Sequence, residues 1–145
     1  FGDLQCTMSG LSNGNSYTFT AVAFNDAGQS APSDPSPVAT ILAGPGKPLN
    51  VRATRNDRSV KILWGAPKST GGTPIRGYTV TASPSGKSCK ATKPTGCTIT
   101  YLPVGATYVF TVQAKNAKAA GLSTSSNPIT IPAPPPPPKE VPTFS

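Results

Sequence analysis

Short runs of alternating apolar and polar residues follow one another along this chain, and turn residues separate them. Side chains repeat every second residue along a β-strand, so such a run presents one apolar face. No segment carries an apolar period of a helix over a comparable length. The alternation predicts strands around residues 51–53, 60–64, 78–82, 108–114 and 129–131, with a shorter one at Ile99. We therefore expect an all-β fold, a small sandwich of short strands joined by turns.

The chain repeats itself at an offset of 91 residues. Nine of the twenty positions from residue 6 to residue 25 are identical to the residues 91 positions later. The identical pairs include Cys6 with Cys97, Tyr17 with Tyr108, and Phe19 with Phe110. Such a period is too long for a helical solenoid and fits a small β-sandwich. We interpret residues 1–43 as the C-terminal part of one module and residues 44–131 as a complete second module.

Several motifs of the complete copy occur together in one family. The copy opens with Gly-Pro-Gly-Lys-Pro-Leu-Asn-Val at residues 44–51, carries Trp64 in its second strand, and has Ile-Arg-Gly-Tyr-Thr-Val at residues 75–80. Leu102 also lies six residues before Tyr108. The set resembles the fibronectin type III module, an immunoglobulin-like β-sandwich in which this spacing marks a tyrosine corner. The resemblance implies tandem modules, of which the second is complete and the first truncated.

A cysteine pair narrows the resemblance further. Cys89 and Cys97, with turns rich in Ser, Thr and Gly, are similar to a variant of the module in secreted proteins of actinobacteria and their relatives. That variant occurs in large surface proteins and beside the catalytic domains of polysaccharide hydrolases. The resemblance therefore implies an extracellular or cell-surface location.

The three cysteines differ in their expected state. Cys89 and Cys97 flank a seven-residue turn, typical of a hairpin, which brings two sulfurs within disulfide reach. A bond that closes so short a loop contributes about 2.5 kcal/mol in the chain-entropy model. A reduced pair, buried or bound to a metal, is the alternative. The repeat offset places the partner of Cys6 before residue 1, so we expect Cys6 to have no partner within this chain.

The aromatic residues are candidates for either a core or a sugar-binding platform. Trp64 alternates with Val60 and Ile62, which places it on the same face as two β-branched neighbours. Such a position favours burial, because a residue normally shares the environment of its face. We therefore assign Trp64, Tyr108 and Phe110 to the core.

Charge is unevenly distributed along the chain. The formal net charge of +8 combines three acids and no bases in residues 1–44 with twelve bases and one acid in residues 45–131. Basic residues around the first two strands form a candidate polyanion-binding cluster, namely Arg52, Arg55, Arg58 and Lys61, and a second group lies around the cysteine turn, namely Lys87, Lys90 and Lys93. The candidate partners are anionic cell-wall polymers, acidic polysaccharides and nucleic acids. Nucleic acid is disfavoured because no exposed aromatic residues interleave with the bases, and a charge that only maintains solubility is the favoured alternative.

The residue inventory excludes most catalytic chemistry. The chain has no His and three Cys, so it contains neither a histidine-based triad nor a four-ligand Cys/His zinc site. Asp57 is the single acid in residues 45–131, so the module cannot supply the carboxylate pair of a glycosidase. No apolar run is long enough for a membrane span. We therefore expect no enzyme activity, catalytic residue, metal ligand, cofactor or membrane-spanning segment.

These features together favour a non-catalytic spacer and interaction module of a large secreted or cell-surface protein. Residues 132–145 combine a proline run, which adopts stiff polyproline II, with either the start of a further module or a fraying end. The expected partners are neighbouring domains of the same polypeptide, and an upstream segment or another chain that completes residues 1–43. The alternative is an accessory module of a secreted polysaccharide-degrading enzyme whose catalytic domain lies outside this chain.

Overall fold

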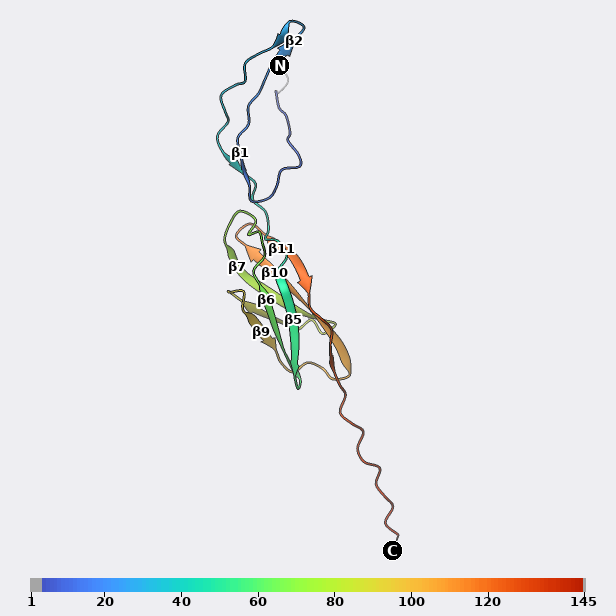
Figure 1. The fold of residues 1–145 in the computed structure, drawn as a ribbon. Helices are drawn as coiled ribbons and strands as arrows, with labels where there is room; N and C mark the ends of the chain where they lie inside the picture. Colours follow the sequence, from blue (N-terminus) through green and yellow to red (C-terminus); the bar gives the residue numbers. More distant parts are fainter. Residues whose placement is uncertain (1–3, 145) are drawn as a thin grey trace.

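A computed structural model describes residues 4–144, in which the secondary structure consists of strands (Figure 1). Residues 1–3 and 145, which belong to the predicted segments 1–43 and 132–145, lie outside the described residues. From residue 49 to residue 131 the strands form a sandwich of two antiparallel sheets, which confirms the predicted all-β fold class.

The eight strands of the sandwich belong to two sheets. The first sheet has the order β5-β6-β9, with β5 at Leu49–Asn56, β6 at Ser59–Gly65 and β9 at Gly96–Ile99. The second has the order β11-β10-β7-β8, with β7 at Ile75–Ser83, β8 at Ser88–Ala91, β10 at Ala106–Asn116 and β11 at Ala120–Ser125. β12, at Ile129–Ile131, pairs with the first residues of β10. The alternation pattern missed β8 and β11, because these edge strands carry few apolar residues.

One apolar core fills the space between the sheets. Alternate residues of β6, β7 and β10 are buried there, and the largest fully buried side chains include Tyr108, Phe110 and Ile62. Trp64 is 5% exposed, and its ring centroid lies 5.5 Å from that of Tyr78. The structure thus places Trp64, Tyr108 and Phe110 in the core, where an indole offers no platform to a sugar.

A tyrosine hydrogen bond closes the loop that leads into β10. The Tyr108 hydroxyl donates to the backbone carbonyl of Pro103 at 2.8 Å. In residues 4–43 the repeat equivalent, Tyr17, accepts a hydrogen bond at 3.0 Å from the backbone N–H of Ser12, which also lies five residues before its tyrosine. This bond lowers the pKa of Tyr17. The sequence repeat therefore has a counterpart in local structure.

A serine contact repeats in the same way. Ser126 donates its backbone N–H to the Phe110 carbonyl at 2.8 Å, and its hydroxyl accepts the Phe110 N–H at 3.1 Å. Ser36 makes the same pair of bonds with Phe19, at 2.8 and 3.0 Å. The edge of the sandwich and residues 19–36 thus share this hydrogen-bond pattern.

Residues 4–43 nevertheless form an open loop that extends from one end of the sandwich (Figure 1). Two short strand pairs hold it: β1 (Ser16–Tyr17) with β4 (Ala39–Thr40), and β2 (Phe24–Asn25) with β3 (Gly28–Gln29). Its large apolar side chains are 60% exposed or more at Leu4, Met8, Phe24 and Val38. Phe19 is half-buried, although its equivalent Phe110 is fully buried. The described part of this segment therefore builds no core of its own.

Candidate functional site

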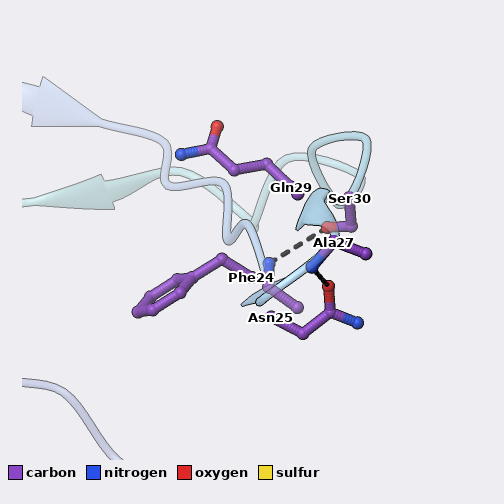
Figure 2. A pocket seen from close by; sticks show the side chains of 7 residues that line it. Phe24, Asn25, Ala27, Gln29 and Ser30 are labelled. Atoms are coloured by element: carbon purple, nitrogen blue, oxygen red, sulfur yellow. Dashed lines mark hydrogen bonds between the residues drawn. The ribbon is translucent and has the colours of Figure 1, made fainter.

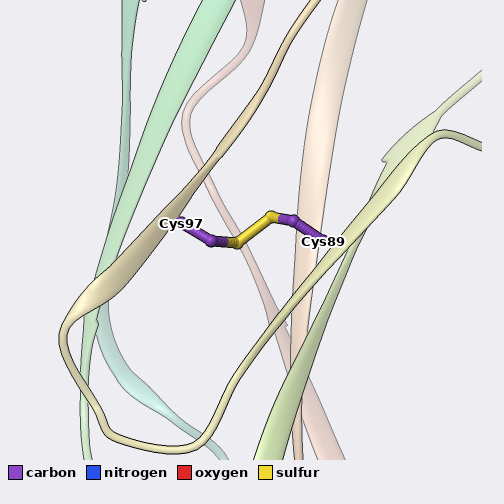
Figure 3. The surroundings of a disulfide bond; sticks show 2 residues. All are labelled: Cys89 and Cys97. Atoms are coloured by element: carbon purple, nitrogen blue, oxygen red, sulfur yellow. A yellow bond between two sulfur atoms is a disulfide. The ribbon is translucent and has the colours of Figure 1, made fainter.

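A disulfide bond joins Cys89 to Cys97, with Cα atoms 6.2 Å apart (Figure 3). The two cysteines belong to different sheets, because Cys89 lies opposite Val80 on β7 and Cys97 lies opposite Ile62 on β6. The predicted hairpin pairing is therefore wrong. Each short strand pairs with a longer strand whose inward residues are buried, so that both cysteines pack against the core. The bond links the two sheets across one open edge of the sandwich.

Cys6 has the state expected from the repeat. It is exposed, and among the described residues it has no disulfide partner.

The predicted polyanion-binding cluster is divided between two surfaces. Lys61 on β6 lies opposite Thr54 on β5, and Arg52 is two residues before Thr54 on β5. Arg52 and Lys61 therefore share the outer face of the first sheet. Arg55 and Arg58 lie at the β5–β6 turn instead. The guanidinium of Arg55 donates to the Asp57 carbonyl at 3.4 Å, and that of Arg58 donates to the Leu102 carbonyl at 3.3 Å.

This division changes what the cluster can bind. Arg55 and Arg58 line a hollow of about 290 Å³ together with residues 132–135 of the proline-rich segment. Of the four cluster residues, a polyanion on the outer face of the first sheet would therefore meet Arg52 and Lys61 but not the two at the turn. The predicted four-residue cluster is not a single surface.

Hydrogen bonds at residues 43–46 connect the loop of residues 4–43 to the sandwich, and we call these residues and their contacts the junction. The side-chain amide of Asn116 donates to the carbonyls of Ala43 at 2.7 Å and Thr70 at 2.8 Å. Its oxygen accepts the backbone N–H groups of Lys118 and Ala119, both at 2.9 Å. All the hydrogen-bonding atoms of this buried amide are thus used. The repeat identity of Asn25 with Asn116 was the sequence signal for this residue.

Backbone contacts strengthen the same junction. The N–H of Ala43 donates to the Gly71 carbonyl at 2.9 Å, and the N–H of Gly46 donates to the Ser69 carbonyl at 2.9 Å. The N–H of Leu122 donates to the Pro45 carbonyl at 3.1 Å. The β6–β7 loop and strand β11 therefore both hold residues 43–46.

A hollow of about 360 Å³ lies at the β2–β3 turn (Figure 2). Asn25 shapes this turn, because its side-chain oxygen accepts the Ala27 N–H at 2.9 Å. The other lining residues include Phe24, Gln29 and Ser30, so that no titratable side chain lines the hollow. The lining of this hollow therefore supplies no acid or base.

Basic residues surround a second hollow, of about 500 Å³, on the outer face of the second sheet. Its four cations are Arg76, Lys90, Lys93 and Lys115. In the sequence, Lys90 and Lys93 lie near the cysteine turn, but no sequence pattern relates them to Arg76 or Lys115. Only the pairing of β7 with both β8 and β10 brings the four together.

Residues 4–144 contain neither a cluster of metal-ligating side chains nor a membrane-spanning helix. In this part of the chain no group of three or more His, Cys, Asp or Glu residues is arranged to hold a metal ion. The same residues include no helix long and apolar enough to cross a membrane.

Comparison with known proteins identifies the sandwich. The Fibronectin type III domain matches residues 46–131. Human myomesin-2 is 34% identical in an alignment of 142 residues that covers 89% of this chain and 10% of that protein. Bovine receptor-type tyrosine-protein phosphatase F is 31% identical in an alignment of 122 residues that covers 81% of this chain and 6% of that protein. The chain thus spans a tenth or less of the length of these curated relatives.

Solved structures share the fold at lower sequence identity. Domains d3–d4 of the rat CD45 extracellular region superpose with a TM-score of 0.60 at 18% identity, covering 89% of this chain and 71% of that one. Domains A168–A170 of titin give a TM-score of 0.57 at 22% identity, covering 86% of this chain and 44% of that one. The curated relatives named above are animal proteins and give no support to an actinobacterial origin. The sandwich, the tyrosine corner and the match over residues 46–131 show that the chain belongs to the fibronectin type III family.

Proposed function

We propose that this chain is a spacer and interaction module, without catalytic activity, within a larger multidomain protein. The observation that carries the proposal is the junction at residues 43–46, which hydrogen bonds hold on several sides. The proline-rich segment leaves the sandwich at the end opposite this junction (Figure 1). Polyproline II advances about 3 Å per residue and is stiff, so this segment acts as a spacer at one end of the sandwich, and the junction fixes the chain at the other end.

The junction transmits orientation because it is made of direct contacts. Asn116 is 7% exposed, and its two donated bonds tie residue 43 to the loop at Thr70. The backbone of Gly14, in the preceding loop, approaches Gly72 so closely that a Cβ on Gly14 would lie 3.3 Å from the Gly72 nitrogen. A flexible linker would make neither contact. Rigid spacing is therefore the function that this geometry supports best.

Residues 1–43 belong, in this proposal, to a preceding module of the same kind. An apolar hollow of about 430 Å³ is lined by Met8, Phe19 and Val22, among others. In the complete module, the residue equivalent to Phe19 lies in a core that β5, β6 and β9 cover. We infer that equivalent strands, from an upstream stretch or from another chain, cover this hollow.

An extracellular or cell-surface location is the second part of the proposal. Disulfides persist in oxidising compartments and are rare in the cytosol. The Cys89–Cys97 bond supports this location.

Limited proteolysis under native conditions tests the spacer function. In the full chain, we expect Asn116→Ala to increase the rate of cleavage within residues 42–46 about tenfold, because the amide that ties the Ala43 carbonyl to the Thr70 carbonyl of the β6–β7 loop is lost. Asn127→Ala is the matched control, since Asn127 makes two bonds to Ala53, away from the junction. Mass spectrometry of the fragments locates the cuts. Equal cleavage of this linker in both variants would show that the junction does not depend on Asn116 and would contradict the proposal.

A further inference from the structure

The basic hollow on the second sheet collects cations from separate parts of the chain. Lys90 lies on β8, opposite Thr79, and Lys115 lies near the end of β10, opposite Gly77. Since β7 runs between β8 and β10, the two lysines are two strand spacings apart, about 10 Å across the sheet. All four cations of the hollow are exposed.

A β-bulge directs Arg76 to this face. The pairing of β7 with β10 passes from Gly77 opposite Lys115 to Ile75 opposite Asn116, which leaves Arg76 without a partner. Regular alternation would turn Arg76 to the face opposite Gly77. A bulge re-aims the extra residue, and here Arg76 is exposed and lines the hollow.

Gly77 lines the hollow between Lys90 and Lys115. A Cβ at this position would lie 3.2 Å from the Ala91 carbonyl oxygen and 3.8 Å from the Lys115 Cε. The glycine therefore leaves space that the Lys115 side chain crosses. On the other side, the Thr95 N–H donates to the Lys93 carbonyl at 2.9 Å and constrains the turn that carries Lys93.

No acid of the module balances these charges. Asp57 is the single acid in residues 45–131, and it lies at the β5–β6 turn, beside the proline-rich segment. Arg76 and Lys115 lie next to Ile75 and Asn116, near the other end of the sandwich. A cleft lined by one sign of charge concentrates ions of the opposite sign.

The lining selects among anionic ligands. Exposed ammonium groups are screened and hold a single small anion weakly, so a polymer that meets several of them at once has the advantage. Tyr78 lines the hollow but is 2% exposed, which leaves no aromatic face for a nucleic acid base to stack on. The hydroxyls of Thr92 and Thr95 complete a polar lining. This combination suits the charged and hydroxyl groups of an acidic sugar chain.

We propose that the hollow formed by Arg76, Lys90, Lys93 and Lys115 binds an anionic polysaccharide. Its negative groups, sulfate or carboxylate, lie between Lys90 and Lys115, and Arg76 contacts the chain from the bulge. This binding site differs from the predicted cluster on β5 and β6. It is independent of the spacer function, because a failed binding assay would leave the junction contacts unchanged.

Binding of labelled oligosaccharides to the full chain tests the proposal, with heparin as the sulfated probe and hyaluronan as the carboxylate probe. At low salt we expect the double substitution K90E/K115E to weaken binding of the better probe at least tenfold. The matched control, R52E/K61E, changes the net charge equally on the other sheet, and we expect it to weaken binding less than threefold. K90R/K115R keeps the charges and is expected to retain binding. Binding should also weaken steeply between about 0.1 M and 1 M salt, as the Debye length falls from about 10 Å to about 3 Å.

Three results would overturn the proposal. Equal losses in the two charge-reversal variants would assign the binding to overall charge, and absence of binding to both probes would remove the site. A duplex DNA of matched charge that binds more tightly than both oligosaccharides would contradict the assignment to a sugar chain. The substituted side chains are exposed, so unchanged circular dichroism spectra are expected and verify that each variant is folded.

Discussion

Breaking the Cys89–Cys97 bond perturbs the sandwich at a single edge. Reduction breaks the bond and adds one hydrogen to each sulfur but removes no heavy atom, so it isolates the effect of the crosslink. The double substitution C89A/C97A also removes the sulfur atoms, which pack against the core beside Val80 and Ile62. Comparing the two perturbations separates the crosslink from the packing.

The size of the crosslink effect follows from the length of the closed loop. The two cysteines are eight positions apart. In the chain-entropy model, a loop of this length restricts the unfolded chain by about 2.5 kcal/mol. That free energy corresponds to about a 70-fold change in the equilibrium constant of unfolding. Its loss lowers the melting temperature by about 10 °C or more for a module of this size. We expect C89A/C97A to lower the free energy of unfolding by about 1 kcal/mol more for each partly buried side chain that is truncated.

Urea denaturation of the oxidised, reduced and doubly substituted proteins measures these differences. A Cys6→Ala background prevents disulfide exchange, and this exposed substitution should itself change the free energy of unfolding by less than about 0.5 kcal/mol. A reduced protein with the same denaturation midpoint as the oxidised one would refute the loop-closure argument. A midpoint shift in C89A/C97A without one on reduction would assign the stabilisation to packing.

Two tyrosines give further predictions. Tyr108→Phe removes the hydrogen bond to Pro103 and should lower the free energy of unfolding by about 1 kcal/mol in urea titrations, whereas Tyr101→Phe, at a side chain 74% exposed, should change little. Equal effects would show that the tyrosine corner does not stabilise the fold. Burial raises the pKa of Tyr78 above its ordinary value of 10.0, so the unfolded chain loses this proton first and stability should decline as pH rises above about 10. Tyr78→Phe should remove this part of the decline, and parallel stability curves for the two proteins between about pH 8 and 11 would contradict the assignment.

Local patterns in the sequence were sufficient for most of the sandwich. Alternation reports which side of a strand faces away from water, and it therefore identified the core positions of Trp64, Tyr108 and Phe110. The repeat pointed to Tyr17 and Asn25 as equivalents of Tyr108 and Asn116, which have defined contacts in the sandwich. Alternation depends on neighbouring residues, and the repeat depends on comparing two segments of the sequence. For that reason they are readable without knowing which strands pair.

Contacts between distant residues required the tertiary structure. Cysteines eight positions apart suggested a hairpin, but their strands joined different sheets, because each paired with a longer strand that borders the core. Arg52 and Arg55 are close in sequence, yet alternation and the β5–β6 turn direct them to separate surfaces. The basic hollow shows the converse, since strand register and one bulge bring Arg76 to Lys115 across 39 positions of sequence. The sequence by itself determined the module and its core through local periodicity, whereas strand pairing decided which charges meet.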